Sequence, residues 1–246
     1  MPAIGADLVK ICDDAAPWPP YTYPAAKADG ADPDARTGAM VDFLDAIMKR
    51  AGLQYSVKLD PWERCIKELK VGRTEVMIGA AFNEKRDKFA YFTKPTHKST
   101  QAIFYFDKYF PDGIDWDSPA DTEKFTVCRI RGFNYSEVML SDSNPAVESK
   151  NVEIALQHMR RGRCQILFSS VEPIMGAKLY GDSIVPEGIR YQEYAQKEPN
   201  DYHIMVSKAS PRGEDLLLTL DEAISQLIKD GTRDRIFDSY YQLMEK

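Results

Sequence analysis

Hydrophobic and polar positions alternate in two rhythms along the first 95 residues. Short apolar runs at Leu8–Cys12, Tyr55–Leu59 and Val76–Ile78 are typical of strands that pack inside a protein. Between these runs, apolar residues recur at helical spacing after Gly38 and after Pro61. Because strands and helices follow one another in turn, the pattern predicts a mostly parallel sheet covered by helices.

The alternation continues beyond residue 95. An apolar stripe between Ser210 and Gly231 predicts a long helix, with Ser210 as its N-cap and Pro211 at its first position. Ligands of parallel sheets bind beyond the carboxyl ends of the strands, so the segments that follow predicted strands are where we expect a site. The other predicted elements, strands first, are Gln101–Phe106, Phe125–Cys128, Gln165–Phe168, Asp201–Lys208, Glu153–Arg161 and Asp234–Met244.

Composition and charge narrow this picture by exclusion. The chain has 246 residues, 43% of them hydrophobic, which suffices for one large core or two smaller ones. Its net charge of −6 argues against a general nucleic-acid binder. No run approaches the ~20 consecutive apolar residues that span a membrane. The chain opens with Met1-Pro2-Ala3, as an added start would, so we expect that an export signal has been removed.

The cysteines and histidines do not have the spacing of a zinc site, because no CxxC pair is present. We therefore expect no metal and no cofactor. An even number of scattered cysteines fits two disulfides in an oxidising compartment, whereas four buried thiols fit a cytosolic protein, and the residues alone leave both open. The residues concerned are Cys12, Cys65, Cys128, Cys164, His97, His158 and His203.

The segment around Arg86 is the strongest candidate for binding chemistry. Gly79, Ala80 and Ala81 follow an apolar run, and such small residues let a ligand approach the backbone. Arg86 comes next, and Phe92 then begins the sequence Phe-Thr-Lys-Pro. Backbone N–H groups beside a guanidinium suit a planar anion such as a carboxylate. An isolated arginine on a short helix is more often a surface residue. The neighbouring sequence is therefore needed to distinguish a ligand contact from a surface residue.

Small residues, then Glu-Lys-Arg, then Phe-Thr-Lys-Pro resemble the order "small residues, T-x-E-R, F-[ST]-x-P" of the bacterial extracellular solute-binding proteins, family 3. These proteins serve polar amino-acid ABC transporters. The family's arginine clamps the α-carboxylate of the ligand, and the resemblance gives this role to Arg86. The chain departs from the pattern at Ala81 and Phe82, where relatives carry Thr or Ser, so no hydroxyl contact is carried over.

Further residues of the first half resemble ligand contacts of that family. Trp18, in Pro17–Tyr21, matches the stacking aromatic of the motif "[FYW]-x-P-[FY]". Prolines stiffen such a loop and present its rings at low entropic cost, although packing against the core is the alternative for these rings. Asp14, Trp62 and Gly79–Ala81 all follow predicted strands, so we expect them at one edge of the sheet.

Two turns of the second half resemble the family's remaining contacts. The turn that begins at Arg131 resembles "V-x-x-G-[TS]", in which a helix N-terminus faces the ligand, with two residues replaced. In relatives that bind amino acids, an aspartate near a later turn holds the α-ammonium; here Glu172 is the nearest carboxylate, and a first-turn helix acid is its alternative role. The contacts implied for this half are Arg131, Phe133, Asn134, Tyr135, Ser169, Ser170 and Glu172.

The resemblance spans nearly the whole chain and implies an α/β, type II periplasmic-binding-protein fold. Two α/β lobes would be joined by a two-stranded hinge, with lobe 1 formed by residues 1–105 plus 202–246 and lobe 2 by the inserted residues 106–201. It also implies a periplasmic monomer that captures an amino acid or related carboxylate in its cleft by hinge closure and presents it to a membrane ABC permease.

Two other functions on this fold stay open, because a fold does not determine a function. One is the ligand-sensing component of a signalling receptor. The other is a periplasmic enzyme similar to cyclohexadienyl dehydratases, for which Glu172, His97 or Glu63 would supply a general acid or base. The sequence contains no nucleophile–base pair and no Gly-rich phosphate loop, so we expect binding rather than catalysis.

The lobes that the resemblance implies also suggest how the cysteines pair. Cys12 and Cys65 would both lie in lobe 1, and Cys128 and Cys164 in lobe 2. Pairing within each lobe leaves a hinge free to move, whereas a bond between lobes would block closure. Each bond closes a loop of several tens of residues, a constraint worth roughly 3–4 kcal/mol in the chain-entropy model.

Overall fold

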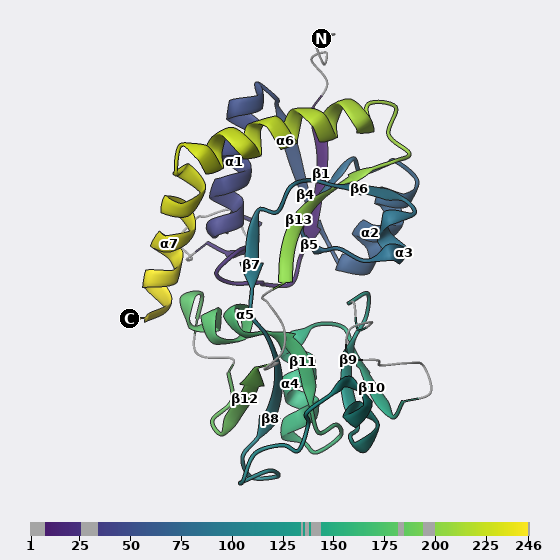
Figure 1. Cartoon of the computed structure of the whole chain (residues 1–246), viewed down its shortest axis with the longest axis vertical. Coiled ribbons are helices and arrows are strands. Elements are labelled where there is room, and N and C mark those ends of the chain that lie inside the picture. The colour runs from purple at the N-terminus through teal and green to yellow at the C-terminus, as the bar shows by residue number, and fades with distance from the viewer. Residues whose placement is uncertain are drawn as a thin grey trace. The chain divides into compact units, whose positions relative to one another are not determined.

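The computed structural model describes residues 8–25, 34–133, 135, 138, 144–181, 185–193 and 200–245. The chain divides into two compact units (Figure 1). Unit 1 comprises Met1–Lys98 and Asp201–Lys246, and unit 2 comprises Ser99–Asn200. No helix in the described ranges is both long and apolar enough to cross a membrane.

Unit 1 is built on a six-stranded mixed sheet with the order β4-β1-β5-β13-β6, in which β7 also pairs with β13. β1 runs parallel to β4 and β5, as the alternation predicts, whereas β13 is antiparallel to β5 and β6. A separate two-stranded ladder joins β2 to β3. The strands of this unit are β1 (Val9–Asp14), β2 (Tyr23–Pro24), β3 (Arg36–Thr37), β4 (Tyr55–Asp60), β5 (Val76–Ala81), β6 (Ala90–Phe92), β7 (His97–Ser99) and β13 (Asn200–Ser207).

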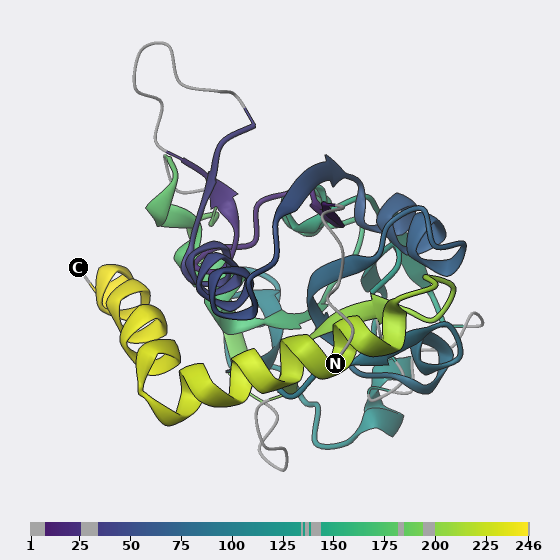
Figure 2. The same cartoon turned by 90° about the horizontal axis from the view of Figure 1, so that it is seen from above.

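Helices cover both faces of this sheet, which explains its continuous apolar runs. Ile11 and Ile78 pack in one core cluster with α1 and α6, while their neighbours along the strands, Cys12 and Met77, pack with α2 on the opposite face. Figure 2 shows α6 and α7 meeting at an angle beside α1. The helices are α1 (Ala39–Ala51), α2 (Trp62–Lys70), α3 (Glu84–Asp87), α6 (Gly213–Lys229) and α7 (Thr232–Glu245).

The described residues of unit 2 form two small sheets. β8 (Gln101–Phe106) pairs antiparallel with β11 (Leu167–Ser170) and with β12 (Ile189–Glu193). β9 (Val127–Ile130) pairs parallel with β10 (Ala146–Ser149). The described helices of this unit are η1 (Pro119–Lys124), α4 (Val152–Arg160), α5 (Val171–Met175) and η3 (Gly176–Leu179).

Two boundaries differ from the sequence-based expectation. The first crossing between units was expected near residue 105, but unit 2 already begins at Ser99, because β8 pairs with β11 and β12. The predicted N-cap at Ser210 is wrong, since α6 begins only at Gly213. The Ser210 hydroxyl instead donates to Glu75 Oε1 at 3.0 Å, so a tertiary contact replaces the cap.

Both predicted disulfides are present, one inside each unit. Cys12 of β1 is bonded to Cys65 of α2, with their Cα atoms 5.6 Å apart. Cys128 of β9 is bonded to Cys164, with their Cα atoms 5.4 Å apart. Both Cα separations fall in the usual range for disulfides, and each bond joins two elements of one core.

Candidate functional site

Arg86 is a buried cation at the edge of unit 1. It belongs to α3, whose N-cap Asn83 accepts the Arg86 backbone N–H at 2.8 Å through its side chain. The guanidinium Nη1 donates to the carbonyl oxygen of Ala81 at 2.8 Å, and its Cζ atom lies 5.5 Å from the centre of the Trp62 ring. The side chain is 8% exposed, and burial lowers its pKa to about 10. It therefore remains charged at neutral pH while largely removed from water.

Trp62 and Asp14 join this arrangement from two other elements. Asp14 is the last residue of β1, and its carboxylate accepts the backbone N–H of Ala16 at 3.1 Å and that of Trp62, the first residue of α2. Burial raises the pKa of Asp14, while these two N–H groups act in the opposite direction. The Trp62 indole Nε1 is buried and makes no hydrogen bond within the part of the chain that the structure describes.

The small residues Gly79, Ala80 and Ala81 form the end of β5. Gly79 has φ +68°, a conformation that favours glycine, and a Cβ atom there would meet nothing within 4 Å. Ala80 and Ala81 pair with His203 and Tyr202 of β13, so part of their backbone is used in the sheet. The Ala81 carbonyl orients Arg86. The structure thus brings Asp14, Trp62, Ala81 and Arg86 together around one point of unit 1.

Trp18 lies in a tight turn that is fixed by its own backbone. Its N–H donates to the Thr22 carbonyl at 2.6 Å, and the Thr22 N–H donates back to the Trp18 carbonyl at 3.0 Å. The half-buried indole packs against the core cluster of α1 and α6, whereas Trp62 packs against the cluster of α2. Trp18 and Trp62 therefore belong to opposite faces of the sheet.

Asp13 is not among the residues predicted to contact the ligand, yet among the described acids of unit 1 its pKa is shifted furthest from the usual value. It is 6% exposed at the end of β1, and burial raises its pKa to about 7. The backbone N–H of Asp14 and the side chain of Thr22 bond to its carboxylate and oppose this rise. Asp13 thereby ties β1 to the Trp18 turn. An acid that directly follows the apolar run Ile11–Cys12 at the end of a predicted buried strand is the signal that could have identified it.

The first predicted turn of unit 2 follows β9. Arg131 is exposed, with its Nε atom 3.9 Å from Glu148 Oε2, and Phe133 is half-buried against the core. The Tyr135 hydroxyl accepts the backbone N–H of Ile130 at 2.7 Å, and burial raises the pKa of this hydroxyl. Asn134, the remaining residue predicted here, lies outside the described residues.

The second predicted turn joins β11 to α5. The Ser170 hydroxyl accepts a hydrogen bond from Gln101 Nε2 at 2.8 Å, while the Ser169 hydroxyl is buried and has no hydrogen-bond partner among the described residues. Glu172 Oε1 accepts the backbone N–H of Thr100 at 2.9 Å, and its Oε2 accepts the hydroxyl of Ser99. The carboxylate of Glu172 therefore binds the junction between β7 and β8.

The model of the bacterial extracellular solute-binding proteins, family 3, matches residues 10–243. The chain belongs to this family. Its resemblance to the family pattern around Arg86 is thus part of a relationship that covers both units.

Individual relatives of this family 3 protein share low sequence identity with it. It is 22% identical over 226 residues to the L-cystine-binding protein TcyA of Bacillus subtilis (strain 168), covering 91% of this chain and 78% of the relative. A solved ancestral arginine-binding protein bound to arginine is 22% identical, with a TM-score of 0.75 and 96% of this chain and 100% of that chain covered. A histidine kinase sensor domain with similarity to periplasmic binding proteins is 20% identical, with a TM-score of 0.75, covering 94% and 95%. These structures establish the type II periplasmic-binding-protein fold.

The structure also shows the contacts of the three side chains considered as a general acid or base. Of the three groups that an enzyme would use, Glu172 is occupied by Ser99 and Thr100. Burial lowers the pKa of His97 to about 3, so this imidazole is neutral, and it stacks on Tyr202 with the ring centres 5.0 Å apart. Glu63 pairs with Lys67 at 3.1 Å on the surface of α2. Arg86, by contrast, is a rigidly oriented cation of the kind that binds carboxylates.

Proposed function

We propose that this family 3 protein is a periplasmic solute-binding protein that captures an amino acid or a related small carboxylate and delivers it to an ABC permease. The observation that carries this proposal is the buried guanidinium of Arg86, which is oriented by the Ala81 carbonyl and covered by the Trp62 ring. A guanidinium offers two parallel N–H groups to one carboxylate, and burial strengthens such bonds by excluding water.

The relatives support the amino acid as ligand class. TcyA is named as a binding protein for L-cystine, and the ancestral protein was solved with arginine. Both ligands carry the α-carboxylate that Arg86 would bind. Gly79–Ala81 would add backbone N–H donors, and Trp62 would cover the body of the ligand. On this reading the protein works without a cofactor and without catalysis, as a monomer.

Isothermal titration with matched ligands tests the proposal. L-Cystine, L-arginine and L-glutamine should be compared with succinate and with amines that lack the α-carboxylate. We expect binding only of compounds that carry a carboxylate, because Arg86 supplies the main charge-assisted contact. Binding of the amines at equal affinity, or binding of none of these compounds, would refute the carboxylate specificity.

We also infer that the ligand shifts an equilibrium between two arrangements of the units, with the chain crossing between them twice as a hinge. Small-angle scattering with and without saturating ligand measures this directly, and we expect a smaller radius of gyration when the ligand is bound. An unchanged radius would remove the support for closure.

A sensing role is the second candidate, because the histidine kinase sensor domain has the same fold at 20% identity. Uptake of the identified ligand by cells that lack this protein separates the two roles. Loss of uptake supports delivery to a permease, whereas unchanged uptake with a lost transcriptional response supports sensing.

A further inference from the structure

The Cys12–Cys65 disulfide joins the two elements that carry Asp14 and Trp62. Cys12 lies two residues before Asp14 on β1, and Cys65 lies three residues after Trp62 on α2. Residues three apart on a helix share one face, so Trp62 and Cys65 face the same side of α2. The covalent bond and the hydrogen bond from the Trp62 backbone to Asp14 therefore hold the same helical turn against the same strand.

The disulfide is fully buried and tightly packed. Both cysteines are 0% exposed, and the Sγ atom of Cys65 lies 3.5 Å from the Asp13 carbonyl oxygen and 3.7 Å from that of Asp60. A disulfide sulfur has no proton to donate, so these are packing contacts. Through these contacts the first turn of α2 packs against the ends of β1 and β4. Arg86 is held at the same edge of the sheet.

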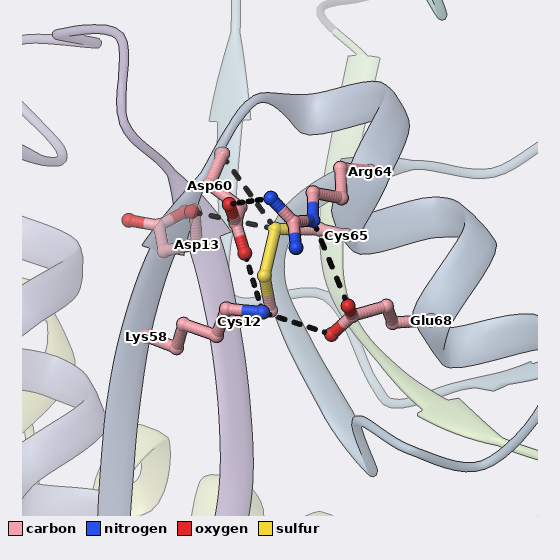
Figure 3. Close-up of polar contacts among 7 residues, drawn as sticks. All are labelled: Cys12, Asp13, Lys58, Asp60, Arg64, Cys65 and Glu68. Atoms are coloured by element: carbon pink, nitrogen blue, oxygen red, sulfur yellow. Dashed lines mark hydrogen bonds and ion pairs between the residues drawn. A yellow bond between two sulfur atoms is a disulfide. The ribbon is translucent and has the colours of Figure 1, made fainter.

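Ion pairs beside the disulfide also link β4 to α2 (Figure 3). Asp60 contacts Lys58 at 2.6 Å and Arg64 at 3.3 Å, and Glu68 contacts Lys58 at 3.1 Å. The Lys58 and Arg64 side chains are 49% and 62% exposed, and ion pairs in such surroundings contribute little. The covalent bond therefore constrains the position of this turn more strongly than these ion pairs do.

We propose that the Cys12–Cys65 disulfide is a positioning element for ligand recognition, because it holds Trp62 and Asp14 where they shape the surroundings of Arg86. The inference rests on the proposed function and adds a dependence of ligand affinity on this bond. Without the bond, α2 is free to move away from β1, the Trp62 ring no longer covers the guanidinium, and water reaches Arg86.

The second disulfide provides a matched control. Cys128–Cys164 is equally buried and spans 36 residues, compared with 53 for Cys12–Cys65, so the two bonds restrict the unfolded chain similarly. Cys128 lies on β9, which the ladder with β10 holds in place independently of the bond. α2 has no such ladder, so only the first disulfide is expected to control the position of a candidate contact.

The test compares Cys12→Ala/Cys65→Ala with Cys128→Ala/Cys164→Ala by isothermal titration with L-cystine, L-arginine and L-glutamine. It is carried out at a temperature at which circular dichroism shows both variants folded. We expect the first pair to weaken binding tenfold or more and the second pair to change it less than threefold. Equal effects of the two pairs, or an unchanged affinity of the first, would overturn the proposal.

Hydrogen exchange without ligand separates this inference from the proposed function. Backbone amides of residues 62–66 should exchange at least tenfold faster in the first variant than in the wild type and in the control variant. Unchanged exchange would overturn the positioning role, whether or not any of the three amino acids binds. Absence of binding by all three amino acids would count against the proposed function and not against the positioning role. If the alanine pair does not fold, Cys12→Val/Cys65→Ala restores buried volume and serves for both measurements.

Discussion

The candidate residues of unit 1 and those of unit 2 are held in different ways. In unit 1, Arg86 and Asp13 are charged or titratable groups that burial removes from water, and burial shifts the pKa of each. In unit 2, the Glu172 carboxylate and the Tyr135 hydroxyl are occupied by backbone N–H groups of their own unit. Unit 1 thus buries ionisable groups at a cost in folding free energy. Unit 2 instead uses a carboxylate and a hydroxyl group as hydrogen-bond acceptors that stabilise its turns.

The comparison indicates where ligand chemistry is concentrated. Desolvated charges cost folding free energy, and such groups cluster at functional sites more often than satisfied ones. On this argument unit 1 supplies the strong electrostatic contact, and the predicted contacts of unit 2 act mainly in folding. Four measurements test this difference between the units.

The largest expected effect concerns Asp13. Its pKa is raised from 3.8 to about 7 on folding, so its contribution to stability is fully present below pH 3.8 and is lost as the pH rises through about 7. The loss amounts to roughly 4–5 kcal/mol, from ~1.4 kcal/mol per pKa unit. Asp13→Asn should therefore be relatively more stable than the wild type at pH 8 than at pH 4.5, as measured by urea denaturation. Parallel pH dependences of the two proteins would show that Asp13 titrates normally.

Arg86→Ala should weaken ligand binding by roughly two orders of magnitude or more, since charge-assisted hydrogen bonds contribute ~1.5–3 kcal/mol each. Arg86→Lys should weaken it nearly as much, because an ammonium cannot form the paired hydrogen bonds. Isothermal titration measures both, and Arg50→Ala, which removes surface contacts with Asp230 and Gln226, serves as control. Normal binding by Arg86→Ala would show that the carboxylate lies elsewhere.

Glu172→Gln should lower the free energy of unfolding by about 1–2 kcal/mol, because the Thr100 N–H and the Ser99 hydroxyl lose a charged acceptor. Ligand affinity should stay within about threefold of the wild type. Denaturation and titration of one preparation measure both quantities. A large loss of affinity with unchanged stability would place Glu172 on the ligand and make the two units alike.

The smallest expected effect is that of Tyr135→Phe. Removing its hydroxyl leaves the buried Ile130 N–H without this acceptor, which costs about 1 kcal/mol of stability. Affinity should change by less than about threefold. Thermal denaturation and titration again separate the two. An affinity loss that exceeds the stability loss would identify the β9 turn as a direct ligand contact.

The order of the elements and much of their packing could be predicted from the amino-acid sequence alone. The apolar runs that became β1, β4 and β5 and the stripe that became the buried face of α6 are local signals, because burial on a sheet or helix face imposes its period on the chain. The cysteine pairing also followed once two lobes were expected. Arg86 could be singled out because small residues and a Phe-Thr-Lys-Pro sequence surround it.

The hydrogen-bond partners and burial of each polar side chain could be read only from the tertiary structure. Glu172 has the same sequence signal whether it binds a ligand or accepts the Thr100 N–H, and its partner lies 72 residues away along the chain. Ser210 has the sequence signal of a helix cap. In the structure its hydroxyl donates to Glu75, which is 135 residues away along the chain. Asp13 titrates near neutral pH because residues brought together by folding exclude water from it. Hydrogen-bond partners and desolvation are properties of neighbours in space, and the local pattern of residues does not contain them.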